Sequence, residues 1–285
     1  PRPRAPRPGR GRSGDRVLED TPARPPRPRL KRTVARHNGR VLYRDEAIVL
    51  RTHKLGEADR IVTLLTRQSG RVRAVAKGVR RTSSRFGSRL EPFTHVDLQL
   101  AEGRSLDTIT QAETLTPFSK GLGLDYDRYT AGTVMLETAD RLVAEEREPS
   151  VQQFLLLVGG LRAMVAGEHA PGQVLDSYLL RSLAVAGYAP SFEHCARCGT
   201  VPPAGARHRW FNPSMGGMLC ATCRVPGSAS PAPETVALLG ALLAGDWSVV
   251  DGAEPRPLRE ASTLVAAYLA WHLERGLKSL AYVER

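Results

Sequence analysis

Long apolar runs are missing from this chain of 285 residues. The longest run, residues 236–245, spans ten residues, contains two glycines and ends before Asp246. A helix that crosses a bilayer needs about 20 apolar residues, so the sequence predicts no membrane span. The polar first 40 residues also lack the apolar core, about 7 to 15 residues long, that marks a secretory signal. We therefore expect the protein to work in the reducing cytoplasm.

Signatures of catalysis are missing as well. The sequence contains no HExxH, no GxSxG, no Walker phosphate loop and no GxGxxG after a strand. Its carboxylates are scattered, whereas a metal-dependent nuclease needs several of them grouped around Mg²⁺. The sequence therefore predicts no catalytic residues and a protein that is not an enzyme.

Acidic residues are scarce at the start of the chain, where most of the net charge of +12 is concentrated. Residues 1–40 hold 13 Lys or Arg and three acids, a net of +10, while residues 41–285 hold 28 against 26, a net of +2. The Pro/Arg-rich composition of this tail predicts disorder. It is either a basic arm that attracts phosphates or a segment outside the natural protein, with Val41 as a candidate start. We base no functional prediction on this tail.

Cysteines are few, and their spacing predicts a metal site. The chain has four, in two CxxC pairs separated by 21 residues: Cys195, Cys198, Cys220 and Cys223. Two such knuckles joined by a hairpin supply the four tetrahedral sulfurs that Zn²⁺ prefers. The alternatives are buried thiols without a metal or two disulfides, the latter favoured only in an oxidising compartment. His194 and His208 are expected to be bystanders. Because four thiolates close the coordination shell, the predicted zinc is structural.

The hydrophobic pattern divides the rest of the chain into strands and helices. Five runs alternate apolar and polar residues as half-buried strands do, at residues 46–55, 59–67, 71–79, 95–102 and 106–115. Helical spacing follows at residues 126–146, 151–165, 173–186, 233–244 and 258–280. We expect an α+β multidomain protein with an OB-fold at 42–116, an α-helical domain at 117–191 and 227–285, and an inserted zinc-binding module at 192–226. An SH3-like barrel is the structural alternative.

The stretch at residues 71–90 is the strongest candidate for ligand contact. It has seven basic residues and no acid, whereas the remainder of 41–150 has 10 basic residues and 16 acids. Strand alternation places Val72, Ala74 and Ala76 on one side and Arg71, Arg73 and Lys77 on the other. A loop with Arg80, Arg81, Arg85 and Arg89 follows, and Phe86 there is a candidate for base stacking. Pairing of these arginines with nearby acids is the alternative.

Four segments of the sequence, in chain order, are EAIVLRTHKLGEADRIVTLLTRQSGRVRAVAKGVRRTSSRFGSRLEPFTHVDLQL, DYDRYTAGTVMLETADRL, LLRSLAVAGYAPSFEHCARCG and WHLERGLKSLAYVER. Together they resemble the RecO family of bacterial DNA repair proteins, and its actinobacterial members most. The similarity runs from about residue 42 to the end of the chain. It implies an N-terminal OB-fold, a helical domain and a zinc-binding module.

The resemblance also implies a function. Members of the family bind single- and double-stranded DNA, anneal complementary strands, and act with RecR to load RecA onto single strands coated by the single-stranded DNA-binding protein SSB, whose C-terminal tail they recognise. We carry the DNA-binding role to one set of basic residues: Arg71, Arg73, Lys77, Arg80, Arg81, Arg85 and Arg89, with Lys54 and Arg60 as weaker members. A zinc-ribbon protein that binds RNA or acts in transcription is the alternative function.

The segment between the two cysteine pairs has an aromatic pair, Trp210 and Phe211, flanked by Arg207 and Arg209. The turn-forming pairs Asn212-Pro213 and Gly216-Gly217 predict a hairpin here. These residues either contact DNA or, because small zinc modules have little core of their own, supply the module with packing. The sequence leaves both roles open.

Overall fold

The computed structural model describes residues 35–37, 40–82, 84, 86–143, 145–273 and 277–283. Of the basic tail predicted at residues 1–40, the described residues include only Ala35–His37, which form strand β1, and Arg40, the first residue of β2. The rest of the tail lies outside the described part of the chain, as do Ser83 and Arg85.

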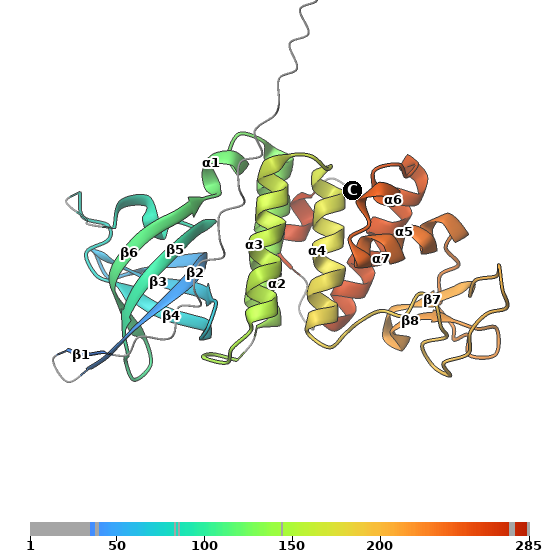
Figure 1. Ribbon diagram of the computed structural model, residues 1–285, viewed down its shortest axis with the longest axis horizontal. Helices are drawn as coiled ribbons and strands as arrows, with labels where there is room; N and C mark the ends of the chain where they lie inside the picture. Colours follow the sequence, from blue (N-terminus) through green and yellow to red (C-terminus); the bar gives the residue numbers. More distant parts are fainter. Residues whose placement is uncertain are drawn as a thin grey trace, which may run out of the picture. The chain divides into compact units, whose positions relative to one another are not determined.

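The N-terminal part is a closed barrel with OB topology (Figure 1). Its strands are β2 (Arg40–Leu55), β3 (Asp59–Thr66), β4 (Gly70–Ala76), β5 (Thr94–Ala101) and β6 (Asp107–Pro117). β2 pairs with both β3 and β5, and β4 pairs in parallel with β6, so the circuit runs β2-β3-β4-β6-β5 and back to β2. This Greek-key closure confirms the OB-fold rather than the SH3-like alternative.

The long strand β2 takes part in two cores. Ala47 and Val49 point into the barrel, whereas Ile48 and Leu50 pack in the core that the barrel shares with the helices. A bulge between Val49 and Arg51 bends the strand, so that it pairs with β5 through its first half and with β3 through its second. One face of the barrel is thereby packed against α2 and α3.

The C-terminal part is helical apart from one short hairpin. The α-helices are α1 (Ser119–Leu122), α2 (Tyr126–Leu142), α3 (Val151–Ala166), α4 (Pro171–Val185), α5 (Pro233–Ala244), α6 (Trp247–Val250) and α7 (Pro255–His272). Two 3-10 helices, η2 (Pro213–Met215) and η3 (Ser279–Tyr282), belong to this part, and a third, η1 (Gly87–Leu90), lies between β4 and β5 of the barrel. Between α4 and α5 the strands β7 (Trp210–Asn212) and β8 (Gly217–Leu219) form the predicted hairpin. The α+β fold is confirmed.

Two predicted helices end earlier than expected. The helix predicted at 126–146 ends at Leu142, because the next segment pairs with the edge of β4, where Arg147 N donates to Arg71 O at 2.9 Å. The helix predicted to reach residue 280 ends at His272. The later residues form η3, whose first amides are bound by the Glu137 carboxylate. In both places tertiary hydrogen bonds replace helical ones.

Among the helices that the structure describes, none is long and apolar enough to cross a membrane.

Candidate nucleic-acid interface and metal centre

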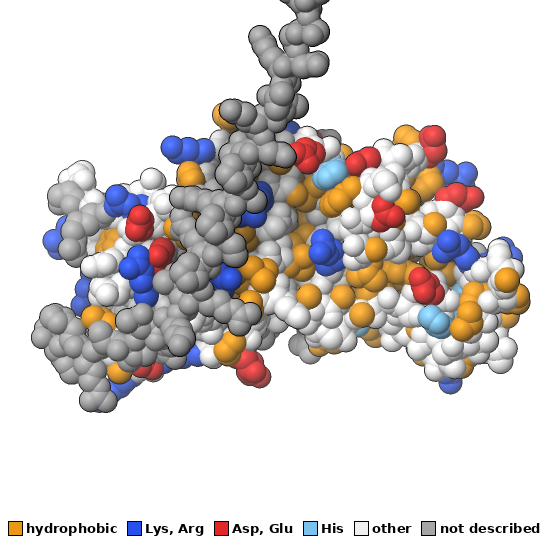
Figure 2. Space-filling view, in the orientation of Figure 1, with side chains coloured by type: hydrophobic (Ala, Val, Ile, Leu, Met, Phe, Trp, Pro, Cys, Tyr) orange, Lys and Arg blue, Asp and Glu red, His pale blue; other side chains and the backbone are white. Residues whose placement is uncertain are grey.

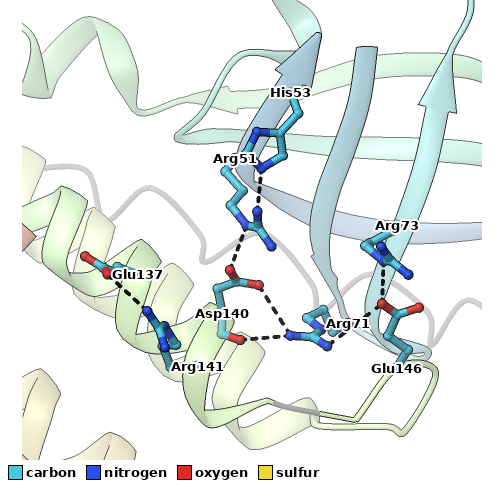
Figure 3. Close-up of polar contacts among 8 residues, drawn as sticks. All are labelled: Arg51, His53, Arg71, Arg73, Glu137, Asp140, Arg141 and Glu146. Atoms are coloured by element: carbon cyan, nitrogen blue, oxygen red, sulfur yellow. Dashed lines mark hydrogen bonds and ion pairs between the residues drawn. The ribbon is translucent and has the colours of Figure 1, made fainter. Parts of the chain in front are cut away.

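Strand β4 presents its side chains as the alternation predicts. Val72, Ala74 and Ala76 are buried, while Arg71 and Arg73 point to the other side. These two arginines, however, contact carboxylates from beyond the barrel (Figure 3). Arg73 Nε lies 2.5 Å from Glu146 Oε1, and Arg71 lies 3.6 Å from Asp140 Oδ1 and 3.9 Å from Glu146 Oε1. On β4, therefore, Arg71 and Arg73 are paired with acids, as in the alternative interpretation, and do not form a free basic face.

Asp140, on α2, joins the barrel to the helices. Its Oδ2 accepts a hydrogen bond from Arg51 Nε at 2.7 Å, and its backbone carbonyl accepts one from Arg71 Nη1 at 3.2 Å. Arg51 also contacts His53 along β2. We call Arg51, Arg71, Arg73, Asp140 and Glu146 the arginine-carboxylate cluster. Figure 2 shows the same mixture, with basic side chains beside acidic ones on the visible face of the barrel.

The cations after β4 differ from those on it. Lys77 and Arg81 are exposed and, within the described residues, form no ion pair. Arg80 is held by the loop between β2 and β3, where its Nη1 donates to Glu57 O at 2.8 Å and Gly56 O at 3.3 Å. We call Lys77, Arg80 and Arg81 the loop cations. The least compensated charge of the predicted site thus lies in the turn after the strand.

The remaining predicted residues are dispersed. Lys54 is exposed and lies opposite Arg60 in the β2–β3 register, but Arg60 contacts Glu91 Oε1 at 2.5 Å. Arg89 is exposed, and Arg85 lies outside the described residues. Phe86 is only 6% exposed and packs in the barrel core, so the idea that it stacks on a base is wrong. Sequence inspection missed Asp140 and Glu146, whose only signal was that they are acids near a helix end.

The four cysteines converge on one point. Their sulfurs all lie within 4.8 Å of one another, and Cys198 Sγ is 3.8 Å from Cys220 Sγ. Zinc–sulfur bonds of about 2.3 Å in a tetrahedron place the sulfurs about 3.8 Å apart. All four cysteines are free, which rules out the two disulfides in this structure. The cluster has the ligands and spacing to hold a metal ion.

Hydrogen bonds within the crowded cluster and from nearby backbone amides shift the pKa values of the thiols in opposite directions. Burial of Cys195 opposes its ionisation, but the backbone amides of Cys220, Cys198 and Arg197 outweigh it and lower the pKa to about 6. Hydrogen bonds with Cys220 and Cys198 raise the pKa of Cys223 to about 12. Thiolates this close repel one another unless a cation offsets their charge. The donor set therefore fits a divalent ion that takes four sulfurs.

The hairpin between the knuckles is fixed to the helices by aromatic packing. Phe211 is 2% exposed, stacks on Phe192 and lies 6.0 Å from the Tyr268 ring of α7. His208 Nε2 contacts Thr200 O at 2.7 Å and takes no part in the sulfur cluster. Phe211 therefore has the packing role, and His208 is a bystander as expected.

Comparison with known proteins covers both parts of the chain. Residues 40–118 match the family model described as Recombination protein O N terminal, and residues 123–281 match Recombination protein O C terminal. A DNA repair protein RecO from a Nocardioides species is 93% identical over 245 residues, which are 86% of this chain and 100% of that protein. Those of Streptomyces coelicolor and Thermobifida fusca are each 61% identical over 86% of this chain and 99% of their own length. The chain belongs to the RecO family of DNA repair proteins.

Proposed function

We propose that this protein is a non-enzymatic recombination mediator. It binds single- and double-stranded DNA, anneals complementary strands, and helps RecR to load RecA onto single strands coated by SSB, whose C-terminal tail it recognises. It does so in the cytoplasm, at the nucleoid. The observation that carries the proposal is a turn of exposed cations, Lys77 and Arg81, without carboxylate partners among the described residues, on an OB barrel.

Annealing requires that two polyanions approach each other while their bases stay free to pair. Cations that neutralise phosphates lower the repulsion, and contacts to phosphate leave the pairing edges open. The barrel suits this task because its loop offers charge while Phe86 is buried. Such a protein would bind reversibly and lose affinity as the salt concentration rises.

The proposed DNA contacts fall into two groups. The loop cations, with Lys54, would contact phosphates first, and Arg85 and Arg89 are further members of the proposed site. Arg60, Arg71 and Arg73 would join only by exchanging a carboxylate for a phosphate, since each is already in an ion pair. Exposed ion pairs are worth about 1 kcal/mol or less, so such an exchange is energetically accessible for Arg73, whose side chain is 44% exposed.

The four-cysteine cluster would hold one structural Zn²⁺ through Cys195, Cys198, Cys220 and Cys223. When bound, the ion would offset the charge of the thiolates and connect the two knuckles. We propose on this basis that residues 192–226 form a zinc-binding module inserted between the helical segments 117–191 and 227–285, after the OB-fold at 42–116.

The test is a strand-annealing assay on SSB-coated complementary oligonucleotides. The protein is compared with a Lys77→Ala/Arg81→Ala variant and with a control, Arg256→Ala/Arg259→Ala, which removes the same charge from the surface of α7. We expect the wild type and the control to anneal, and the loop variant to anneal several-fold more slowly. A wild type that does not anneal would refute the function. A loop variant that anneals like the control would refute the assignment of residues.

A further inference from the structure

The four-cysteine module carries positive charge that the described structure leaves uncompensated. Residues 192–226 contain four arginines and a single acid, Glu193. The arginines are all exposed: Arg197, Arg207, Arg209 and Arg224. Within the described residues none of them forms an ion pair, whereas Arg51, Arg60, Arg71 and Arg73 of the barrel all do. The module is therefore a second cationic surface.

An indole lies in the middle of this surface. The guanidinium carbon of Arg224 lies 3.8 Å from the centroid of the Trp210 ring, and that of Arg209 lies 5.2 Å from it. Arg209 is positioned further by its Nε, which donates to Ser230 Oγ at 3.1 Å. We call Arg209, Trp210 and Arg224 the Arg-Trp stack. It groups two planar cations and one aromatic ring at the start of β7.

Packing of the module does not account for Trp210. The neighbouring Phe211 occupies the core, 2% exposed and in contact with Phe192 and Tyr268, while Trp210 is only partly buried. A partly exposed indole under a guanidinium offers a stacking surface together with charge. Proteins that bind single strands combine these two elements, because every unpaired base has a face to stack and a phosphate beside it.

We propose that the Arg-Trp stack is a second binding site for nucleic acid and is selective for single strands. The inference rests on the proposed DNA-binding function and adds a site to it. A base would stack on the planar groups, and the arginines would contact the adjoining phosphates. Bases in a duplex are already stacked on one another, so duplex DNA lacks the ligand that the indole would bind.

A second site has a consequence for annealing. The barrel packs on α2 and α3, whereas η2 of the module packs on α7, so the two sites are carried by different helices. Two separate sites would allow one protein to hold two strands at once. The loop cations would bind one strand through its phosphates, and the Arg-Trp stack would hold the other through an unpaired base.

The arginines have one rival role. A zinc ion with four thiolates carries a net charge of about −2, and nearby arginines would offset it. In that case their removal would weaken retention of the metal. A nucleic-acid site predicts instead that the metal stays while DNA binding falls, so zinc content separates the two roles.

Trp210 is itself the reporter for the test. The chain has three tryptophans, and Trp247→Phe/Trp271→Phe leaves Trp210 alone in the full-length, zinc-loaded protein. This protein is titrated with labelled oligo-dT and with a labelled duplex, and both label anisotropy and Trp210 emission are recorded. We expect oligo-dT to quench Trp210 and the duplex to leave its emission nearly unchanged. In the same background, Arg209→Ala/Arg224→Ala should weaken oligo-dT binding about tenfold, with unchanged zinc content and thermal midpoint.

Three results would count against the proposal. Oligo-dT that binds by anisotropy without quenching Trp210 would overturn the second site and leave the proposed function intact. Loss of zinc from the Arg209→Ala/Arg224→Ala protein would assign the arginines to the metal instead. Absence of any DNA binding by the parent protein would refute the proposed function itself. Arg224→Lys, which keeps the charge but not the planar group, should bind oligo-dT with intermediate affinity.

Discussion

At the scale of single residues, the arginines proposed to bind phosphate differ in what they already bind. Arg73 and Glu146 are 44% and 31% exposed, so solvent weakens their attraction. Arg71 and Asp140 are 20% and 14% exposed and are held also by a hydrogen bond to the α2 backbone. Arg73 is therefore the member of the arginine-carboxylate cluster most easily released to a phosphate.

Replacing Glu146 with Gln should strengthen DNA binding. The change releases Arg73, and we expect an affinity about two- to fivefold higher, because an exposed ion pair is worth about 0.2 to 1 kcal/mol. The dependence of affinity on salt should also become steeper. Fluorescence anisotropy over a range of salt concentrations measures both. Glu148→Gln is the control, since it removes the same charge from an exposed residue without an arginine partner in the described structure. Equal effects of both variants would mean that only net charge matters.

Replacing Gly70 with Ala should destabilise the hairpin between β3 and β4. Gly70 has φ of +64°, and a Cβ there would lie 1.6 Å from the carbonyl oxygen of Glu148. Gly56 has φ of +56° but nothing within 4 Å, so Gly56→Ala measures backbone strain alone, about 1 to 2 kcal/mol. For Gly70→Ala we expect a loss of about 3 kcal/mol or more. Urea unfolding compares the two. Equal losses would show that the segment around Glu148 moves aside freely.

The sequence predicts the direction of a side chain where that direction depends only on the residue's position in its own strand. Val72, Ala74 and Arg73 point as alternation requires, because side chains on a strand alternate whatever lies beyond it. The partners of Arg71 and Arg73 come from 69 to 73 residues further along the chain. No local pattern identifies them. The burial of Phe86 was equally hidden, since a loop aromatic has no periodicity that would indicate the core.

At the scale of elements, periodic segments were predictable and their ends were not. Most strands fall close to their predicted ranges because turns such as Gln68-Ser69-Gly70 separate them. The exception is β2, predicted at 46–55, which begins at Arg40 because its first half pairs with β5. The early end of α2 depends on pairing with β4, which no signal in the sequence indicates. The sequence does carry a signal for the two-sided burial of β2, since residues 47–50 are apolar without alternation, as expected of a strand buried on both faces.

The docking of η3 should depend on pH. The Glu137 carboxylate accepts hydrogen bonds from Lys278 N at 3.0 Å, Ser279 N at 2.9 Å and Ser279 Oγ at 2.6 Å. Burial alone would raise its pKa, but these bonds prevail and lower it from the ordinary 4.5. A lowered pKa stabilises the folded state above pH 4.5, and this stabilisation is lost as the pH falls through the folded value. The protection factor of the Ser279 amide, which compares its exchange with the intrinsic rate at the same pH, should therefore fall below pH 4.5 more in the wild type than in Glu137→Gln.

Replacing Cys195 with Ser should release the metal and loosen the hairpin of β7 and β8. The buried Cys195 sulfur accepts a hydrogen bond from Cys220 N at 3.4 Å, so it connects the two knuckles even before the metal is considered. Because metal binding and folding are coupled, we expect residues 192–226 to become sensitive to protease while the barrel stays resistant. Zinc analysis and limited proteolysis test this. His194→Ala is the control, and loss of metal there would mean that the histidine is a ligand.

At the scale of the whole molecule, net charge is a poor guide to where DNA binds. Residues 1–40 account for +10 of the formal +12, yet the loop cations and the Arg-Trp stack both lie in residues 41–285, where the net charge is +2. What distinguishes these two places is the absence of carboxylate partners within the described structure, not a surplus of positive residues. In the folded protein some cations are paired with carboxylates and others are not, and the net charge does not distinguish the two kinds.

Removal of residues 1–40 therefore should leave annealing in place and change its response to salt. The barrel, the four-cysteine module and both proposed sites lie in residues 41–285, and a relative at 93% identity is matched over its whole length by 245 residues of this chain. The tail carries 13 Lys or Arg, and each phosphate contact it makes would steepen the fall of affinity with salt. We expect the shortened protein to anneal SSB-coated strands at low salt at a rate within about twofold of the full chain, with a shallower slope of log affinity against log salt. A shortened protein that folds but does not anneal would show that the tail is required for annealing.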